Sequence, residues 1–322
     1  ILDSADKIVT LNKPLERIIV GSGNQAEGVM VLKAVDTVVG VGSWITTQGT
    51  VYPELSELPP VGGFGAGHNE PDIEAIFELD PDLYLIYATH APELDEQLGA
   101  VGIPILCLDF YRPTGLREDT AKLGYVLNRR DEAGAYTDFC DECMNQILEK
   151  TESLSEEDKP RVYLEYTDYL TSSDDETIAL AGGRNIAADL TGGSSEWSGI
   201  VTVDAEWVIE QDPEIFLKWA PYGAGYGTDD PADMKAARDA VLSRTELAHV
   251  SAIEDESVYM NTFSLFGTYY YVSVAYMAKW FHPELFYDLD PQAMHQEYLT
   301  EFLGIDYDLS EHGVFVYPPV ED

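Results

Sequence analysis

Short apolar runs alternate with amphipathic stretches through the first third of the chain. The runs have the length of strands, and the stretches between them repeat apolar positions every three or four residues, as helices do. The runs cover residues 17–20, 37–41, 83–87 and 103–108, and the amphipathic stretches cover residues 25–33, 71–79 and 92–100. This alternation predicts an α/β fold with a mainly parallel sheet covered by helices on both faces. Such sheets bind ligands outside the carboxyl ends of their strands.

The alternation stops at residue 114, where a long helical pattern begins. Apolar residues then recur at helical spacing up to Leu148, and Asn128 divides the pattern into two pieces. The second piece, about 20 residues long, would span about 30 Å at 1.5 Å per residue. A polar stretch ends it, and a new strand run begins at Arg161. The pattern predicts an α/β lobe over 1–113, a helical linker over 114–157 and a second α/β lobe over 158–322.

An internal repeat supports two related lobes. The segment PDIEAIFELDPDLYLIY, from Pro71, aligns without gaps to VDAEWVIEQDPEIFLKW, from Val203, at an offset of 132 residues. The matched pairs are Asp72 with Asp204, Glu74 with Glu206, Glu78 with Glu210, Asp80-Pro81 with Asp212-Pro213, Leu85 with Leu217, and Tyr87 with Trp219. Each copy is typical of a helix, an Asp-Pro turn that stops it, and an apolar strand.

The charge balance excludes some partners. The 322 residues include 18 Lys and Arg but 59 Asp and Glu, which gives a formal net charge of −41. A field of this sign repels nucleic-acid phosphates and anionic lipid headgroups, so neither is an expected partner. The acidic residues are scattered along the chain, which favours adaptation to a salty medium over a specific acidic function.

Cysteine usage and the amino-terminal residues give little direct chemistry. Cys107 lies in an apolar run, and Cys140 and Cys143 are neighbours on a predicted helix, so all three are interpreted as core residues. No apolar stretch reaches the length of a transmembrane helix. The opening residues, ILDSADKIVTLNKPLERIIV, are interpreted as the start of a mature domain after removal of a leader.

No enzyme motif stands out. The sequence Gly21-Ser22-Gly23 resembles the start of a dinucleotide fingerprint, but the third glycine, Gly28, falls two positions too late. A tight strand-to-helix turn at a binding cleft is the favoured interpretation. An enzyme or metallocluster scaffold stays as a remote alternative, because two-lobed α/β folds also hold tetrapyrrole and cluster chemistry.

Two histidines keep a second hypothesis open. His68 and His90 both follow strand runs, near the expected edge of a cleft. Together with Asp168 or Glu196 from the second lobe they could hold bare Zn or Mn. The spacing does not require such a site, and free-metal binding is therefore an alternative rather than the main prediction.

Glu74 and Glu206 occupy equivalent first-turn positions of the two repeated helices. A carboxylate is favoured there by the partial positive charge of a helix N-terminus, which by itself explains the residue type. Because the pair also belongs to the duplicated element, it could dock on two basic sockets of a two-fold symmetric partner.

The chain resembles the helical-linker class of ABC-transporter substrate-binding proteins, which carry ferric siderophores, haem and cobalamin. The matching segments run from end to end, and include GSGNQAEGVMVLKAVDTVVGVG, VGGFGAGHNEPDIEAIFELDPDLYLI, GIPILCLD, KPRVYLEY, AGGRNIAADLTGG, VTVDAEWVIEQDPEIFL and HPELF. The resemblance implies two Rossmann-like lobes, each with a central mainly parallel sheet, joined by a long rigid helix.

The resemblance also implies how such a protein works. It would bind ligand between its lobes without catalysis or an intrinsic cofactor, as an extracytoplasmic monomer that is in some cases lipid-anchored through its leader. Its partner would be an ABC permease dimer with its ATPase, and Glu74 and Glu206 match the two glutamates that contact permease arginines in that family.

Residues just after strand ends are the expected ligand contacts, and most of them are aromatic. They are Ser22, Asn24, Trp44, Phe64, His90, Tyr111 and Arg112 in the first lobe, and Tyr166, Tyr169, Trp197, Trp219, Tyr222 and Phe263 in the second. Basic residues there are few: Arg112, Arg184 and Lys218. Aromatic walls with few cations favour a neutral or weakly charged metal chelate, such as an iron siderophore, haem or a corrinoid, over a strongly anionic complex.

Overall fold

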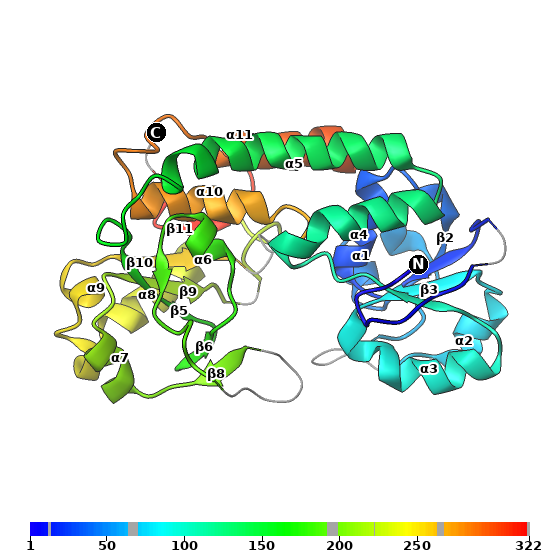
Figure 1. Cartoon of the computed structure of the whole chain (residues 1–322), viewed down its shortest axis with the longest axis horizontal. Coiled ribbons are helices and arrows are strands. Elements are labelled where there is room, and N and C mark those ends of the chain that lie inside the picture. Colours follow the sequence, from blue (N-terminus) through cyan, green and yellow to red (C-terminus); the bar gives the residue numbers. More distant parts are fainter. Residues whose placement is uncertain (12–13, 64–69, 192–198, 222, 263–266, 321–322) are drawn as a thin grey trace. The chain divides into compact units, whose positions relative to one another are not determined.

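The computed structural model describes residues 1–11, 14–63, 70–191, 199–221, 223–262 and 267–320 (Figure 1). The chain forms two compact α/β units. The first comprises Ile1–Cys140 and Glu297–Asp306, and the second comprises Asp141–Gln296 and Tyr307–Asp322. The predicted α/β class with two lobes is confirmed.

The first unit is built as the sequence pattern predicts. Its strands and helices alternate as β1 (Ile18–Val20), α1 (Gly23–Val31), β2 (Val38–Val41), α2 (Ile73–Glu78), β3 (Leu83–Ile86), α3 (Ala91–Ala100), β4 (Ile105–Cys107) and α4 (Pro113–Val126). Short 3-10 turns lie at Val35–Thr37, Ile45–Thr47, Leu55–Glu57 and Ala88–His90. The sheet order is β2-β1-β3-β4, with every pairing parallel.

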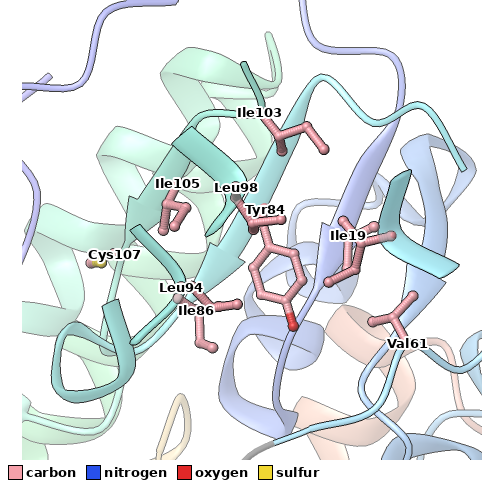
Figure 2. Packing of buried hydrophobic residues seen from close by; sticks show 10 residues of the cluster. Ile19, Val61, Tyr84, Ile86, Leu94, Leu98, Ile103, Ile105 and Cys107 are labelled. Carbon is pink, nitrogen blue, oxygen red and sulfur yellow. The ribbon is translucent and has the colours of Figure 1, made fainter. Parts of the chain in front are cut away.

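Apolar side chains from both layers form the core of this unit. Ile19 and Tyr84 of the sheet pack with Leu98 of α3, and all three are fully buried (Figure 2). Ile76 of α2 is fully buried in the same cluster. Because these strands are buried on both faces, they appear in the sequence as unbroken apolar runs rather than as alternating patterns.

The second unit has a five-stranded sheet and a small ribbon. Its elements are β5 (Arg161–Glu165), β6 (Leu170–Ser172), α6 (Thr177–Leu180), β7 (Arg184–Asn185), β8 (Ile200–Thr202), α7 (Ala205–Gln211), β9 (Ile215–Trp219), α8 (Ala232–Leu242), a 3-10 turn at Thr245–Leu247, α9 (Ser251–Glu254), β10 (Val258–Asn261), α10 (Tyr270–Phe281), α11 (Pro291–Glu297) and β11 (Val316–Tyr317). The sheet order is β11-β10-β9-β5-β7, in which only β11 pairs antiparallel. Strands β6 and β8 form a separate antiparallel pair.

The long helix α5 (Arg130–Thr151) contributes residues to both units. Asn128, at φ 55°, breaks the helical pattern before it, as predicted. In the first unit Phe139 stacks on Phe302, with ring centroids 4.8 Å apart. In the second, the Lys150 ammonium donates to the Leu285 carbonyl at 2.9 Å. The predicted boundaries at 113/114 and 157/158 stay predictions. The division between the two compact units falls within α5, between Cys140 and Asp141, rather than on either side of this helix.

Candidate functional site

Side chains after all four strands gather at the carboxyl edge of the first sheet. Ser22 follows β1, Trp44 follows β2, Tyr87 follows β3, and Tyr111 follows β4. This is the edge at which parallel α/β sheets bind ligands. The order β2-β1-β3-β4 places the change of winding direction between β1 and β3, so Ser22 and Tyr87 flank the point where such ligands bind.

Two of the aromatic residues at this edge contact each other. The Tyr87 and Tyr111 rings lie edge to face with centroids 5.9 Å apart, and the Arg112 guanidinium lies 5.4 Å from the centre of the Tyr111 ring. Burial raises the pKa of Tyr87, and a hydrogen bond with Ser22 only partly opposes it, so this phenol is neutral at physiological pH. The expected residues Ser22, Tyr111 and Arg112 are thus brought together.

Tyr87 is a candidate contact that the sequence analysis did not select. The signal was present, because the internal repeat aligns Tyr87 with Trp219, which was selected. Had the repeat been used to transfer candidates between the lobes, Tyr87 would have been found.

Glycines at the ends of β1 and β2 allow the chain to pack closely at this edge. A Cβ on Gly42 would lie 2.3 Å from the Gly21 carbonyl oxygen, and one on Gly23 would lie 2.9 Å from the Trp44 ring. Trp44 is therefore held against the start of α1 and is still 39% exposed. The tight strand-to-helix turn predicted at Gly21-Ser22-Gly23 is therefore present, and its place at a binding cleft stays a prediction.

Tyr166 and Trp219 form the matching aromatic pair of the second unit. Tyr166 directly follows β5, Trp219 ends β9, and these strands are parallel neighbours. Their ring centroids are 4.0 Å apart at an interplanar angle of 61°. Burial raises the pKa of Tyr166, so it too is a neutral phenol. Both residues are among the ligand contacts expected from the sequence.

A compact ionic cluster lies at the carboxyl end of the same two strands. Glu165 is fully buried and accepts from Lys218 at 2.7 Å and from both terminal nitrogens of Arg244 at 2.8 Å. Asp168 adds a carboxylate 3.2 Å from Arg244. Burial by itself would raise the pKa of Glu165, but the hydrogen bonds from Arg244 and Lys218 outweigh it and hold the pKa below the ordinary value. The two cations are therefore neutralised within the protein.

The aromatic pair and the ionic cluster face opposite sides of the sheet. Side chains alternate along a strand, so Tyr166 and Trp219 point away from the side of Glu165 and Lys218. Tyr169 belongs to the cluster side: its backbone N–H donates to Glu165 at 3.0 Å, and its hydroxyl donates to Glu246 at 3.0 Å. The structure does not group Tyr169 with Tyr166 and Trp219.

The remaining expected contacts divide into two groups. Asn24 lies half-buried in the first turn of α1, and Arg184 begins β7 opposite the first residue of β5, at the amino edge of the sheet. His90 ends a 3-10 turn, and its side chain is not described. The other expected residues, Phe64, His68, Glu196, Trp197, Tyr222 and Phe263, lie outside the described residues.

The free-metal hypothesis depends on those undescribed positions. Among the residues that the structure describes, no group of three or more His, Cys, Asp or Glu side chains could hold a metal ion. His68 and Glu196 fall outside that search, so the hypothesis stays untested.

The internal repeat is a structural repeat. Asp72 caps α2 by accepting from the Ala75 N–H at 3.0 Å, and Asp204 caps α7 by accepting from the Trp207 N–H at 2.8 Å. Both helices are followed by a left-handed aspartate, Asp80 and Asp212, each at φ 44°. The predicted helix, turn and strand are confirmed in both copies.

A backbone clasp extends the repeat beyond the aligned segment. In the first unit the Arg17 N–H donates to the Asp82 carboxylate at 3.1 Å, and the Asp82 N–H donates to the Arg17 carbonyl at 2.7 Å. In the second, Arg161 and Glu214 exchange the same two bonds, both at 2.9 Å. Each clasp ties the repeated turn to the first strand of its own sheet and so fixes the repeated helix on its unit.

Both repeated helices expose the expected docking carboxylate. Glu74 and Glu206 lie in the first turns of α2 and α7 and are exposed. Within the described part of the chain, no cation lies within ion-pair distance of either. Each carboxylate is therefore accessible to a cationic partner.

None of the helices in the described part of the chain has the length and apolarity needed to cross a membrane. The chain resembles a solved TroA-like periplasmic binding protein, FepB from Veillonella parvula, with a TM-score of 0.78 and 21% identity, covering 98% of each chain. This likeness concerns the fold.

Sequence comparison finds curated relatives with two different ligands in their names. A cobalamin-binding protein of Halobacterium salinarum is 28% identical over 224 residues, which span 67% of this chain and 57% of that protein. The chain thus matches little more than half the length of that relative. The molybdate-binding protein MolA of Haemophilus influenzae is 23% identical over 346 residues, spanning 95% of this chain and 91% of MolA.

The family model described as periplasmic binding protein matches residues 18–264, well over half of the chain. That range includes both repeated helices, the whole of α5 and both carboxyl edges described above. The chain belongs to the periplasmic binding protein family, whose members bind and deliver substrates rather than transform them.

Proposed function

We propose that this protein is the substrate-binding component of an ABC importer and that it captures a metal chelate, of the iron-siderophore, haem or corrinoid class. Ligand would bind at the carboxyl edges of the two sheets and be delivered to a permease dimer with its ATPase. The family assignment supports the transport role and implies an extracytoplasmic location. A monomer, with or without a lipid anchor, is part of the proposal.

The observation that carries the ligand class is that the cations at the carboxyl end of β5 and β9 are neutralised by carboxylates of the same unit. Lys218 and Arg244 are held by Glu165 and Asp168, so the carboxyl end of β5 and β9 has two cations and two carboxylates. A bound oxyanion or tris-catecholate needs several cations with hydrogen-bonding capacity to spare. This arrangement favours a ligand of low net charge.

The aromatic residues support the same conclusion. Tyr166 with Trp219, and Tyr87 with Tyr111, offer broad apolar surfaces with hydroxyl groups at their margins. Such surfaces bind flat or bulky rings by stacking and apolar burial. Among the chelates, a corrinoid is supported by the similarity to the cobalamin-binding relative. Because the cations of the ionic cluster are neutralised, an oxyanion such as the molybdate of the MolA relative is disfavoured.

Tryptophan fluorescence tests the ligand class. Haem, cyanocobalamin, a ferric hydroxamate and molybdate would be titrated into the wild type and into Trp219→Phe, with Tyr287→Phe as an exposed control from the same unit. We expect saturable quenching by one of the chelates, reduced in Trp219→Phe and unchanged in the control. Quenching by molybdate alone would contradict the proposed class.

The docking role of Glu74 and Glu206 has a separate test. The double variant Glu74→Ala/Glu206→Ala should keep its ligand affinity, because both side chains are exposed and neither belongs to the two aromatic pairs. It should fail to stimulate import in vesicles containing the permease–ATPase complex. Normal import by this variant would refute the docking role.

A further inference from the structure

Each repeated helix exposes one large apolar side chain at the same position. Phe77 on α2 is 60% exposed, and Ile209 on α7 is 44% exposed. They are aligned by the 132-residue offset of the internal repeat, and each lies three residues after the docking glutamate. Single exposed apolar residues are ordinary, but a matched pair in a duplicated element is not explained by chance exposure.

Folding does not require these two side chains to be apolar. The inward residue of each helix is the preceding one: Ile76 is fully buried in the first core, and Val208 is fully buried in the second. Phe77 and Ile209 belong to neither cluster of buried residues. In a chain of net charge −41, a polar residue there would be equally compatible with the helix.

Helix geometry puts carboxylates next to each exposed apolar residue. Residues three and four apart lie on the same helix face, so Glu74, Phe77 and Glu78 share one exposed face of α2. Glu206, Ile209 and Glu210 share the corresponding face of α7. Each face therefore offers an apolar centre with acidic neighbours, the composition of a small interface with a central anchor.

We propose that Phe77 and Ile209 are paired apolar anchors that seat the two repeated helices on the two like subunits of the permease dimer. The proposal rests on the transport role proposed above and adds the residues that give docking its apolar contact. A surface present twice, once on each repeat, is matched by a partner that presents one socket twice. The acidic neighbours require that socket to be cationic around an apolar floor.

The dependence of docking on salt concentration distinguishes the contribution of the apolar anchors from that of the glutamates. The Debye length falls from about 10 Å at 0.1 M salt to about 3 Å at 1 M, so exposed Glu–Arg attraction is strongly screened in concentrated salt. Apolar contacts are not screened. If the chain works in a salty medium, as its charge favours, the anchors would carry the docking affinity that the glutamates lose.

The test measures docking of the full-length, ligand-loaded protein on proteoliposomes containing the permease–ATPase complex that it stimulates. Dissociation constants would be compared at about 0.1 M and about 2 M KCl. The variants are Phe77→Ser/Ile209→Ser, its two single substitutions, and Glu74→Ala/Glu206→Ala. Val101→Ser/Tyr287→Ser is the matched control, since Val101 and Tyr287 are exposed apolar or aromatic residues, one in each unit, outside the repeated helices.

We expect the double apolar variant to dock about 100-fold more weakly at both salt concentrations, with about tenfold from each single substitution. The glutamate variant should lose much of its defect in concentrated salt, and the control should dock normally. All variants should keep ligand affinity and melting temperature, because the changed side chains are exposed.

Two results would overturn the proposal in distinguishable ways. Normal docking by the apolar variant, with a defect in the glutamate variant, would show that Phe77 and Ile209 are not anchors and would leave the proposed transport role intact. Normal docking by both variants would show that the repeated helices take no part in docking. A defect due entirely to Phe77→Ser or entirely to Ile209→Ser would contradict the paired use of the repeat.

Discussion

At the scale of single residues, buried titratable groups set how the protein responds to pH. His295 is almost fully buried and stacks on Tyr269, with ring centroids 5.2 Å apart. Its Nε2 lies 2.6 Å from the Tyr226 hydroxyl, and the Phe315 ring lies edge to face with the imidazole, with centroids 4.7 Å apart. Burial lowers the pKa of His295 from 6.5 to about 3, so the folded protein holds it as a neutral imidazole.

The low pKa of His295 predicts that the folded protein loses stability over a defined range of acidic pH. A depressed histidine pKa contributes stability that is fully present above pH 6.5 and is lost as the pH falls towards about 3, since the unfolded chain binds the proton first. His295→Gln, which cannot gain that proton, should lose less stability than the wild type over this window. Chemical denaturation at a series of pH values measures it. Parallel pH profiles would contradict the assignment.

Glu165 gives the second prediction at this scale. Glu165→Gln leaves Lys218 and Arg244 without their buried counter-charge and should lower the unfolding free energy by about 3 kcal/mol. Because hydrogen bonds hold the pKa of Glu165 low, its contribution is present near neutral pH and is lost on acidification. Denaturant titration at neutral pH checks the loss, and Glu284→Gln, at an exposed carboxylate of the same unit, is the control. An unchanged midpoint would contradict the role.

The same variant tests the argument about ligand charge. Freed from Glu165, the two cations should give the protein a measurable affinity for molybdate that the wild type lacks. Equal molybdate binding by both proteins would show that the cluster does not set charge selectivity.

At the scale of elements, the repeat makes the two docking helices comparable. Both caps are aspartate side chains that accept a single backbone N–H, in α2 and in α7. Asp72→Ala and Asp204→Ala should therefore each cost about 1 kcal/mol, whereas the corresponding Asn substitutions should cost little. Thermal unfolding of the four variants measures these stability costs. Unequal costs beyond about twofold would show that the two helices are not stabilised alike.

Most elements could be predicted from the sequence because their signals are local. Period, length and turn residues located the first four strands, the helices between them, the break at Asn128 and the repeated unit. The two-residue strands β7 and β11 carry no periodic signal, and the return of residues 297–306 to the first unit depends on contacts distant in the sequence, such as Phe139 with Phe302.

The candidate site was predictable only in part, because some of its contacts join residues that are distant in the sequence. Position after a strand was enough to select Ser22, Tyr111, Tyr166 and Trp219. The neutralisation of Lys218 depends on the register that places it opposite Glu165 and on Arg244 arriving from a later segment. Neither follows from local pattern.

At the scale of the whole molecule, the excess of acidic residues dominates. With 59 acidic and 18 basic residues, self-repulsion opposes the compact state when salt is scarce. The melting temperature should therefore rise steadily between about 0.05 M and 1 M KCl, as the Debye length shortens. Scanning calorimetry measures it, with sucrose of equal osmolality as the control. A flat or falling profile would contradict the role of charge.

The central claim is that the protein binds a metal chelate of low charge, and a thermal-shift panel tests it most directly. The chelates would be a ferric hydroxamate, haem and cyanocobalamin, with molybdate, the strongly anionic ferric tris-catecholate and bare Zn²⁺ or Mn²⁺ as contrasting ligands. A chelate at 100 times its Kd should add about 2.7 kcal/mol of stability and raise the melting temperature accordingly. A shift with molybdate or the bare metals, and none with any chelate, would contradict the account.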